Sequence, residues 1–136
     1  MLTEYIPLEY NNIVKYCYLK KGIEAIMISL ENAIKIYTPM TETMYYILLS
    51  LVEEKHGYGI MQHIEEITNK RLTLGAGTIY KSISRLEIDG LIKSVKVEDR
   101  RKIYKTTELG REILEMEVNR LNELNRNGIL LLERSK

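Results

Sequence analysis

The side chains best suited to chemistry in this sequence are hydroxyls and cations that recur at helical spacing between residues 77 and 90. Thr78, Lys81 and Arg85 fall on one stripe of such a helix, and no carboxylate appears in the stretch before Glu87. This combination suits an anion, and a long polyanion best. Surface helices carry Lys and Arg simply because charges belong in water, so this stretch alone favours a solvated face over a binding face. The opposite stripe is apolar and consists of Ile79, Ile83 and Leu86.

Glycines at both ends give this helix defined limits. Gly77 can act as a small N-cap, and Gly90 suits the left-handed position just past the last turn. The stretch is therefore predicted to be one helix, with an inner face that packs and an outer face that is free to meet a ligand.

A second group of cations stands at a turn. Residues 91–97 and 102–106 alternate in the manner of strands, and residues 98–101 between them are polar. This pattern predicts a β-hairpin, in which successive cations would repel one another unless an anion lies nearby, although Glu98 and Asp99 offset part of that repulsion. The hairpin is thus a candidate for contact with the backbone or the minor groove of DNA. The cations at its tip are Arg100, Arg101 and Lys102.

The distribution of charge is more informative than its total, because 20 Lys and Arg nearly balance 19 Asp and Glu. Residues 70–105 hold ten basic and four acidic residues, a net charge of +6. Residues 38–69 hold one and five (−4), and residues 108–136 hold five and six (−1). A central basic block between acidic flanks is expected of a phosphate-binding surface.

Other chemistries find little support in the sequence. Cys17 is the single cysteine, and His56 and His63 are the only histidines, so neither an intramolecular disulfide nor a metal site is predicted. No glycine loop with a lysine, acid pair or nucleophile with a base indicates an enzyme or a cofactor. The cysteine usage suits a reducing cytoplasm, and neither a signal peptide nor an apolar run of about 20 residues is present to predict secretion or a membrane span.

Two further helices precede the cationic one. The first is expected over residues 40–54, with Thr38 as its cap and Pro39 in its first turn, and the second over residues 58–69. Residues 70–76 form a short connection that contains glycine. Helix, short connection and amphipathic helix with a cationic outer face is the order of a helix-turn-helix, whose second helix enters the major groove.

A last helix is expected from about residue 108 to 126, because Thr107 can cap it and Asn127-Gly128 can end it. The apolar seam of this helix continues so far from the hairpin that a small core cannot cover all of it. The uncovered part of the seam is therefore assigned to a partner helix in a symmetric dimer. Residues 129–132 form an apolar tail that would need burial in the same interface. A small-molecule pocket beside this interface is a weaker alternative to plain packing. The predicted dimer contacts are Tyr45, Leu114, Val118, Leu121 and Leu124.

Residues 1–37 differ in texture from the rest and are rich in Tyr, Ile, Asn and Lys. Residues 1–21 carry no clear pattern, whereas residues 23–36 have apolar side chains at helical spacing and are predicted to form a short helix that packs on the main domain. Two interpretations stay open for this N-terminal extension. It is either a dimerisation or docking arm, or a leader that does not belong to the native core.

Six fragments in register resemble the PadR-type transcriptional regulators, over about residues 38–124. They are TETMYYIL (41–48), HGYGI (56–60), GAGTIY (75–80), LEIDGL (86–91), RKIY (101–104) and TELG (107–110). The resemblance implies a mainly α fold with a small β-hairpin, that is, a winged helix-turn-helix domain plus a C-terminal dimerisation helix. The corresponding divisions are an extension over residues 1–37, the DNA-binding domain over residues 38–107, and the dimerisation helix with its tail over residues 108–136.

The resemblance also implies a dimeric repressor whose third domain helix reads operator DNA. Ala76 stands where many relatives have Pro, which should loosen the turn slightly without altering the fold. Some relatives bind flat aromatic drugs between tryptophans at the dimer centre, but this chain has neither Trp nor Phe. A small-molecule inducer is therefore possible but unsupported. Carried over by position, the residues that would face DNA are Tyr58, Thr78, Tyr80, Lys81, Arg101 and Lys102.

Pattern and resemblance together predict a sequence-specific regulator, not an enzyme, that binds double-stranded DNA as a homodimer and represses transcription. Ile88 would add an apolar contact to a thymine methyl group. The alternative is a winged-helix module for protein interaction, whose basic face meets an acidic partner. The full predicted DNA-binding set is Tyr58, Lys70, Thr78, Tyr80, Lys81, Arg85, Arg100, Arg101 and Lys102.

Overall fold

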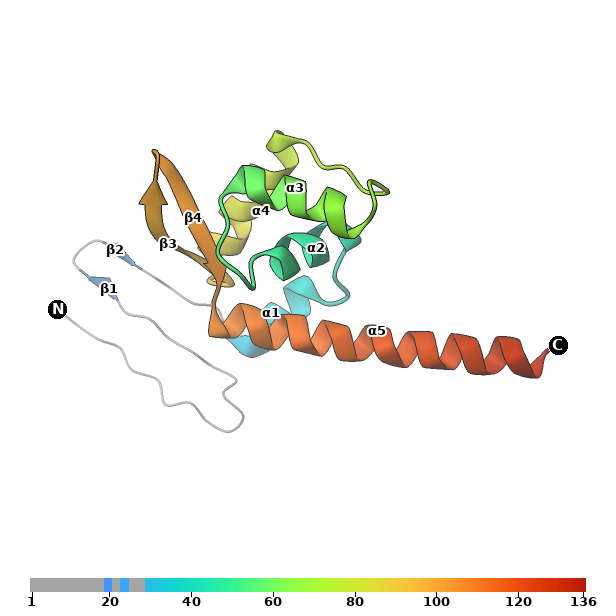
Figure 1. The fold of residues 1–136 in the computed structure, drawn as a ribbon. Helices are drawn as coiled ribbons and strands as arrows, with labels where there is room; N and C mark the ends of the chain where they lie inside the picture. Colours follow the sequence, from blue (N-terminus) through green and yellow to red (C-terminus); the bar gives the residue numbers. More distant parts are fainter. Residues whose placement is uncertain (1–18, 21–22, 25–28) are drawn as a thin grey trace.

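The computed structural model describes residues 19–20, 23–24 and 29–136 of the chain, as five helices and two short antiparallel sheets (Figure 1). Residues 1–21, which carry no clear sequence pattern, lie outside the described residues except for Leu19–Lys20. The elements are β1 (Leu19–Lys20), β2 (Ile23–Glu24), α1 (Leu30–Tyr37), α2 (Glu42–Ser50), α3 (Gly57–Ile67), α4 (Ala76–Ile88), β3 (Ile92–Glu98), β4 (Arg101–Thr106) and α5 (Glu108–Arg134).

The helix predicted over residues 23–36 is the shorter α1, which begins at Leu30 because Ser29 caps it. The Ser29 hydroxyl accepts a hydrogen bond of 3.0 Å from the Asn32 amide. Ala33 and Tyr37 are buried in the main core, with exposed fractions of 0% and 5%. The helix α1 therefore packs on the core of the main domain, as expected for the helix within residues 23–36.

The first helix of the helix-turn-helix begins later than predicted. Thr38 ends α1, and the Thr38-Pro39 peptide bond is cis. The capping residue is Thr41 instead, whose hydroxyl accepts from the Met44 amide at 3.1 Å. Since Ser, Thr, Asp and Asn compete for the cap position, two threonines three residues apart could not be ranked from the sequence.

The next two helices agree with the pattern but differ at their starts. His56 caps α3 through its Nδ1 atom, which accepts from the Gly59 amide at 3.1 Å. Gly75, not Gly77, is the N-cap of α4. Gly90 has φ of 81°, so the predicted left-handed glycine after this helix is confirmed. The inner face of α4 is buried as predicted, through Ile79, Ile83 and Leu86.

Strands β3 and β4 form the predicted hairpin, called here the wing (residues 92–106). Glu98 pairs with Arg101 across the turn, and the register shifts once between Ser94 and Lys96. The base of the wing is held by the connection between α2 and α3, because Lys55 and Tyr104 exchange backbone hydrogen bonds of 3.2 and 2.9 Å. The wing is thus attached to the chain directly before α3.

Helix α5 is longer than predicted and continues through Asn127 and Gly128 to Arg134. Thr107 caps it, as predicted, by accepting from the Gly110 amide at 3.1 Å. The core ends near Glu117, and Figure 1 shows the remainder of α5 running past the other helices to the C-terminus. Residues 129–132 are therefore exposed turns of this helix, not a separate tail. Within the described residues, no helix is long and apolar enough to cross a membrane.

Candidate nucleic-acid interface

The outer face of α4 is the first part of the candidate interface. Thr78, Lys81 and Ile88 are all exposed, and Ile88 has an exposed fraction of 73%. The described residues contain no salt bridge to Lys81. A lysine without a salt bridge, on the same helical stripe as an exposed isoleucine and a hydroxyl, can contact phosphate and base edges, and the isoleucine can contact a thymine methyl group.

Tyr80 joins α4 to the first turn of α3. Its ring is half exposed and lies directly over Gly57, where an added Cβ atom would stand 2.6 Å from the ring Cζ and hydroxyl atoms. Only a glycine leaves room for this contact. The Tyr80 hydroxyl is thereby held beside α3, where it is available to a DNA backbone.

The first turn of α3 and the wing meet at His56. Its Nε2 atom lies 3.4 Å from Nη1 of Arg101, and its ring stacks on Tyr58 with 6.5 Å between the ring centroids. Tyr58 itself is exposed. The structure therefore brings together three of the predicted residues, Tyr58, Tyr80 and Arg101. Sequence reasoning missed His56 and Gly57; the HGYGI fragment was noted, but no local pattern shows that it lies beside the wing.

The tip of the wing carries exposed cations on a strained turn. Asp99 and Arg100 have φ of 48° and 66°, so both lie in the left-handed region. Two successive residues of this kind between paired strands form the type of turn that matches the twist of a hairpin. Arg100 and Lys102 are exposed there, and neither belongs to a salt bridge among the described residues.

Arg85 differs from the other predicted cations, because a carboxylate neutralises it. Its Nε atom donates to Asp89 Oδ2 at 2.8 Å, although 58% of the side chain stays exposed. The same oxygen accepts from the Tyr37 hydroxyl at 2.7 Å. Burial, reinforced by this hydrogen bond, raises the pKa of Tyr37 above its usual range. Arg85 is therefore part of a network that fixes the end of α4.

Lys70 stands at the opposite end of α3 from Tyr58. It follows the helix in a left-handed conformation, with φ of 62°, and is exposed. The length of α3 separates it from the first turn by roughly 15 Å, at 1.5 Å per residue. Lys70 therefore does not join the group formed by Tyr58, Tyr80 and Arg101.

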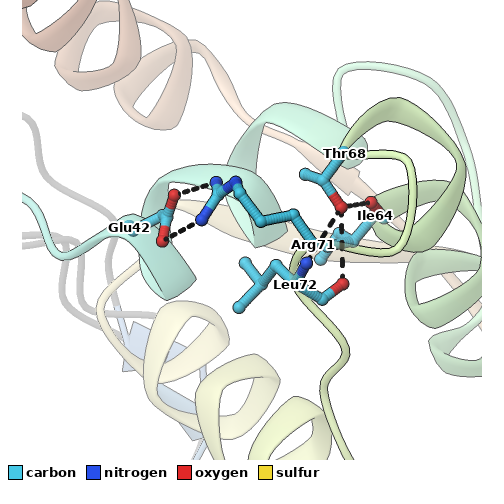
Figure 2. A network of polar contacts seen from close by, with 5 residues as sticks. All are labelled: Glu42, Ile64, Thr68, Arg71 and Leu72. Carbon is cyan, nitrogen blue, oxygen red and sulfur yellow. Dashed lines mark hydrogen bonds and ion pairs between the residues drawn. The ribbon is translucent and has the colours of Figure 1, made fainter.

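The connection between α3 and α4 is tied down next to Lys70 (Figure 2). Arg71 makes a two-pronged ion pair with Glu42 in the first turn of α2. The Thr68 hydroxyl donates to the Ile64 carbonyl at 2.7 Å and accepts from the Leu72 amide at 3.2 Å. These contacts set the start of α4 relative to α2, and hence the direction of its outer face.

The predicted dimer residues are divided between the core and the surface. Leu114 is 4% exposed within the single chain, whereas Leu121 and Leu124 are exposed on α5 beyond the core. Tyr45 and Val118 are half-buried. Tyr45 and Tyr46 also line a cavity of about 270 Å³ with Met40, Glu42, Glu117 and Leu121.

Glu117, in the wall of this cavity, is a buried carboxylate that sequence reasoning did not identify. It accepts from Arg120 at 2.6 and 2.9 Å and from the Met40 amide at 3.2 Å. The Arg120 hydrogen bonds lower the pKa of Glu117, against the opposing effect of burial. The group is thus an ionised link between α5 and the start of α2. No cluster of three potential metal ligands occurs among the described residues.

A helix-turn-helix followed by a basic hairpin defines a winged helix-turn-helix protein. The family model of the transcriptional regulator PadR-like family matches residues 47–116, which run from α2 into α5. The chain belongs to this family.

Solved structures agree with this assignment. A PadR-like transcription factor from Bacteroides fragilis is 31% identical, with a TM-score of 0.57 over 65% of this chain and 88% of that one. A PadR family regulator from Eggerthella lenta is 26% identical, with a TM-score of 0.57 over 67% of this chain and 81% of that one.

Among known sequences, an uncharacterised 37.1 kDa protein of transposon TN4556 from Streptomyces fradiae is 35% identical over 69 residues, which are 51% of this chain but only 19% of that relative.

Proposed function

We propose that this protein is a sequence-specific DNA-binding repressor that acts as a homodimer. The observation that carries the proposal is the meeting of three elements. Tyr80 of α4 rests on Gly57 of α3, and His56 beside it lies 3.4 Å from Arg101 of the wing. One continuous surface therefore presents hydroxyls, cations and the outer face of α4 together, as recognition of a duplex requires.

In this proposal α4 enters the major groove. Lys81 contacts phosphate or the acceptor edge of a guanine, Thr78 adds a hydroxyl, and Ile88 adds an apolar contact to a thymine methyl. Tyr58 and Tyr80 hold the backbone beside the groove, and the wing cations Arg100, Arg101 and Lys102 hold the backbone or the minor groove next to it.

Arg85 is expected to contribute less to DNA binding than Lys81, although both lie on the same stripe of α4. Asp89 already accepts from Arg85 Nε and adds a negative charge close to any approaching phosphate. Lys70 is expected to contribute through long-range attraction, because it stands away from the three meeting elements.

The homodimer is proposed from the second half of α5. Leu121, Leu124 and Leu131 have exposed fractions of 37%, 52% and 59% on a helix that extends past the core. Burying such side chains against a second copy removes a large apolar surface from water. A two-fold dimer would place two α4 helices about one helical turn of DNA apart and block transcription from the site.

The test is a gel shift with genomic fragments selected by the protein, across a salt series. We expect preference over random duplex and an affinity that falls steeply with salt. Lys81→Ala should weaken the complex more than Arg85→Ala, whereas Arg111→Ala, at an exposed residue in the first half of α5, removes the same charge and is the control. Full affinity of the Lys81→Ala, Arg85→Ala double variant at moderate salt would disprove the role of α4. Absence of any shift would favour an acidic protein partner instead.

A further inference from the structure

His56 lies between two N–H donors although a neutral imidazole can accept only one hydrogen bond. The Gly59 amide points at Nδ1 at 3.1 Å, and Nη1 of Arg101 lies 3.4 Å from Nε2. A neutral ring carries a proton on one nitrogen and a lone pair on the other. The two contacts therefore cannot both be hydrogen bonds to His56.

The shorter and less exposed contact decides which nitrogen accepts. The Gly59 amide belongs to the first turn of α3, whose N–H groups have no partner within the helix, and His56 is the capping residue. Nδ1 must therefore keep its lone pair, which places the ring proton on Nε2. The Nε2–H group then faces the guanidinium of Arg101, so that two donors point into the same small region.

Two carboxylates near this region already have a cationic partner. Glu54 and Glu98 line a cavity with His56, and both pair with Lys96, at 3.3 and 3.4 Å. Among the described residues, Arg101 has no salt bridge. An acceptor from outside the chain would satisfy both donors at once, and an oxygen with negative charge would do so best.

We propose that His56 and Arg101 form a phosphate subsite, in which one backbone phosphate of bound DNA accepts from His56 Nε2–H and from the Arg101 guanidinium. This inference rests on the proposed function. Tyr58 stacks on the His56 ring and Tyr80 rests on Gly57, the residue after His56, so both tyrosines proposed to hold the DNA backbone stand beside the subsite. The subsite therefore links the cap of α3 to the wing through the DNA itself.

Two substitutions of His56 separate this role from helix capping. His56→Asp and His56→Asn both supply a side-chain oxygen for the Gly59 amide, and both residues are preferred caps, so the melting temperature should stay at or above that of the wild type. Asp, however, removes the donor, repels phosphate and pairs with Arg101. We expect His56→Asp to weaken DNA binding roughly tenfold or more and His56→Asn to retain most of the affinity.

The pair with Arg101 gives a second measurement. Arg101→Gln should weaken binding clearly in the wild-type background but little in the His56→Asp background, because the subsite is already lost there. Wild-type affinity in His56→Asp, or independent losses from the two substitutions, would overturn the inference while the proposed function stands. A wild-type protein that binds no duplex would overturn the proposed function and this inference with it.

The ring proton can be observed directly by long-range ¹⁵N–¹H NMR. The free protein should show His56 protonated at Nε2, and a ring protonated at Nδ1 would contradict the subsite. A stoichiometric amount of the selected duplex should shift the Nε2 resonance, whereas the same concentration of inorganic phosphate should not. A shift with inorganic phosphate at that concentration would show a site for free phosphate instead and would overturn the proposal.

Discussion

The Tyr37 hydroxyl and the Arg85 guanidinium donate to the same oxygen of Asp89, at 2.7 and 2.8 Å. Asp89 follows directly after α4 and is buried. The helix before the helix-turn-helix is therefore bonded to the end of the helix proposed to read DNA. Two donors on one carboxylate leave the orientation of Arg85 dependent on a residue about 50 positions earlier in the chain.

Tyr37→Phe should destabilise the protein by about 1.5 kcal/mol, because it removes one hydrogen bond to a charged acceptor in a buried place. In the variant, Asp89 still accepts the hydrogen bond from Arg85, which limits the loss of stability. Urea denaturation at neutral pH measures it. Tyr58→Phe, at an exposed tyrosine without a side-chain hydrogen bond among the described contacts, is the matched control and should not change the free energy of unfolding.

The same variant should alter the alkaline stability. Burial and the Asp89 hydrogen bond raise the pKa of Tyr37 in the folded state above the ordinary value, near 10. The resulting stability is present below the unfolded pKa and is lost as the pH rises from there toward the folded pKa. Tyr37→Phe should show a smaller loss between about pH 9 and pH 11. An unchanged alkaline profile would contradict this assignment.

Gly57→Ala should impair DNA binding while leaving the fold intact. The new methyl group meets the far end of the Tyr80 ring at 2.6 Å, and a half-exposed ring can swing away. The displaced Tyr80 hydroxyl then loses its proposed contact with the DNA backbone, worth about 1 kcal/mol of binding free energy. Gly59→Ala is the control on the same helix, because its methyl meets only ordinary contacts at 3.6 Å or more. Equal affinities of the two variants would disprove the positioning role of Gly57.

Glu117→Gln should cost about 2 kcal/mol of stability at neutral pH, since it removes the charge that Arg120 and the Met40 amide bind. The Arg120 hydrogen bonds depress the folded pKa of Glu117. The stabilisation is therefore present above the unfolded pKa, near 4.3, and is lost as the pH falls through the folded pKa. Thermal unfolding from pH 7 to about pH 3 should show a shallower acid loss in the variant. A parallel decline in both proteins would count against this role.

Arg100→Gly should separate the stability of the wing from its binding. Glycine adopts the left-handed conformation of this position without the steric cost of about 1 kcal/mol, so the hairpin should become more stable. Loss of the cation should lower DNA affinity for all sequences alike and reduce the salt slope by about 1. Asp99→Gly relieves the neighbouring position without removing a cation, and should not weaken DNA binding. An unchanged salt slope in Arg100→Gly would place the tip away from phosphate.

Gly128→Ala tests the continuity of α5. Within a helix the substitution should stabilise the protein by up to about 1 kcal/mol, and no atom lies within 4 Å of the new methyl group. If the helix instead ended at Asn127-Gly128 and Gly128 were left-handed, the same change would be destabilising. Chemical denaturation at fixed protein concentration distinguishes the two outcomes.

The elements that carry strong periodicity could be predicted from the sequence. The inner stripe of α4 and the alternation of the wing each depend on contacts that repeat along one element. Accordingly, Ile83 is buried and the turn of the wing lies within residues 98–101, as predicted. The left-handed position of Gly90 follows from its chemistry alone. These features need no knowledge of the rest of the fold.

Features set by distant neighbours could not be predicted in this way. The Asp89 one turn after Arg85 is visible in the sequence, but the Tyr37 hydroxyl that holds this carboxylate in place comes from a helix far earlier in the chain. The expected end of α5 near residue 126 is wrong because Asn127-Gly128 is an ordinary stop signal that a long helix can override. The place of His56 beside Arg101 results from the packing of the wing and has no local sequence signal.

The backbone bonds between Lys55 and Tyr104 bear on the speed of recognition. Because they hold the base of the wing next to the start of α3, the wing would already be ordered before the proposed binding of DNA. A preorganised surface loses little conformational entropy on binding. Association should therefore be governed by electrostatic attraction toward the basic block, with a rate that falls as ionic strength rises.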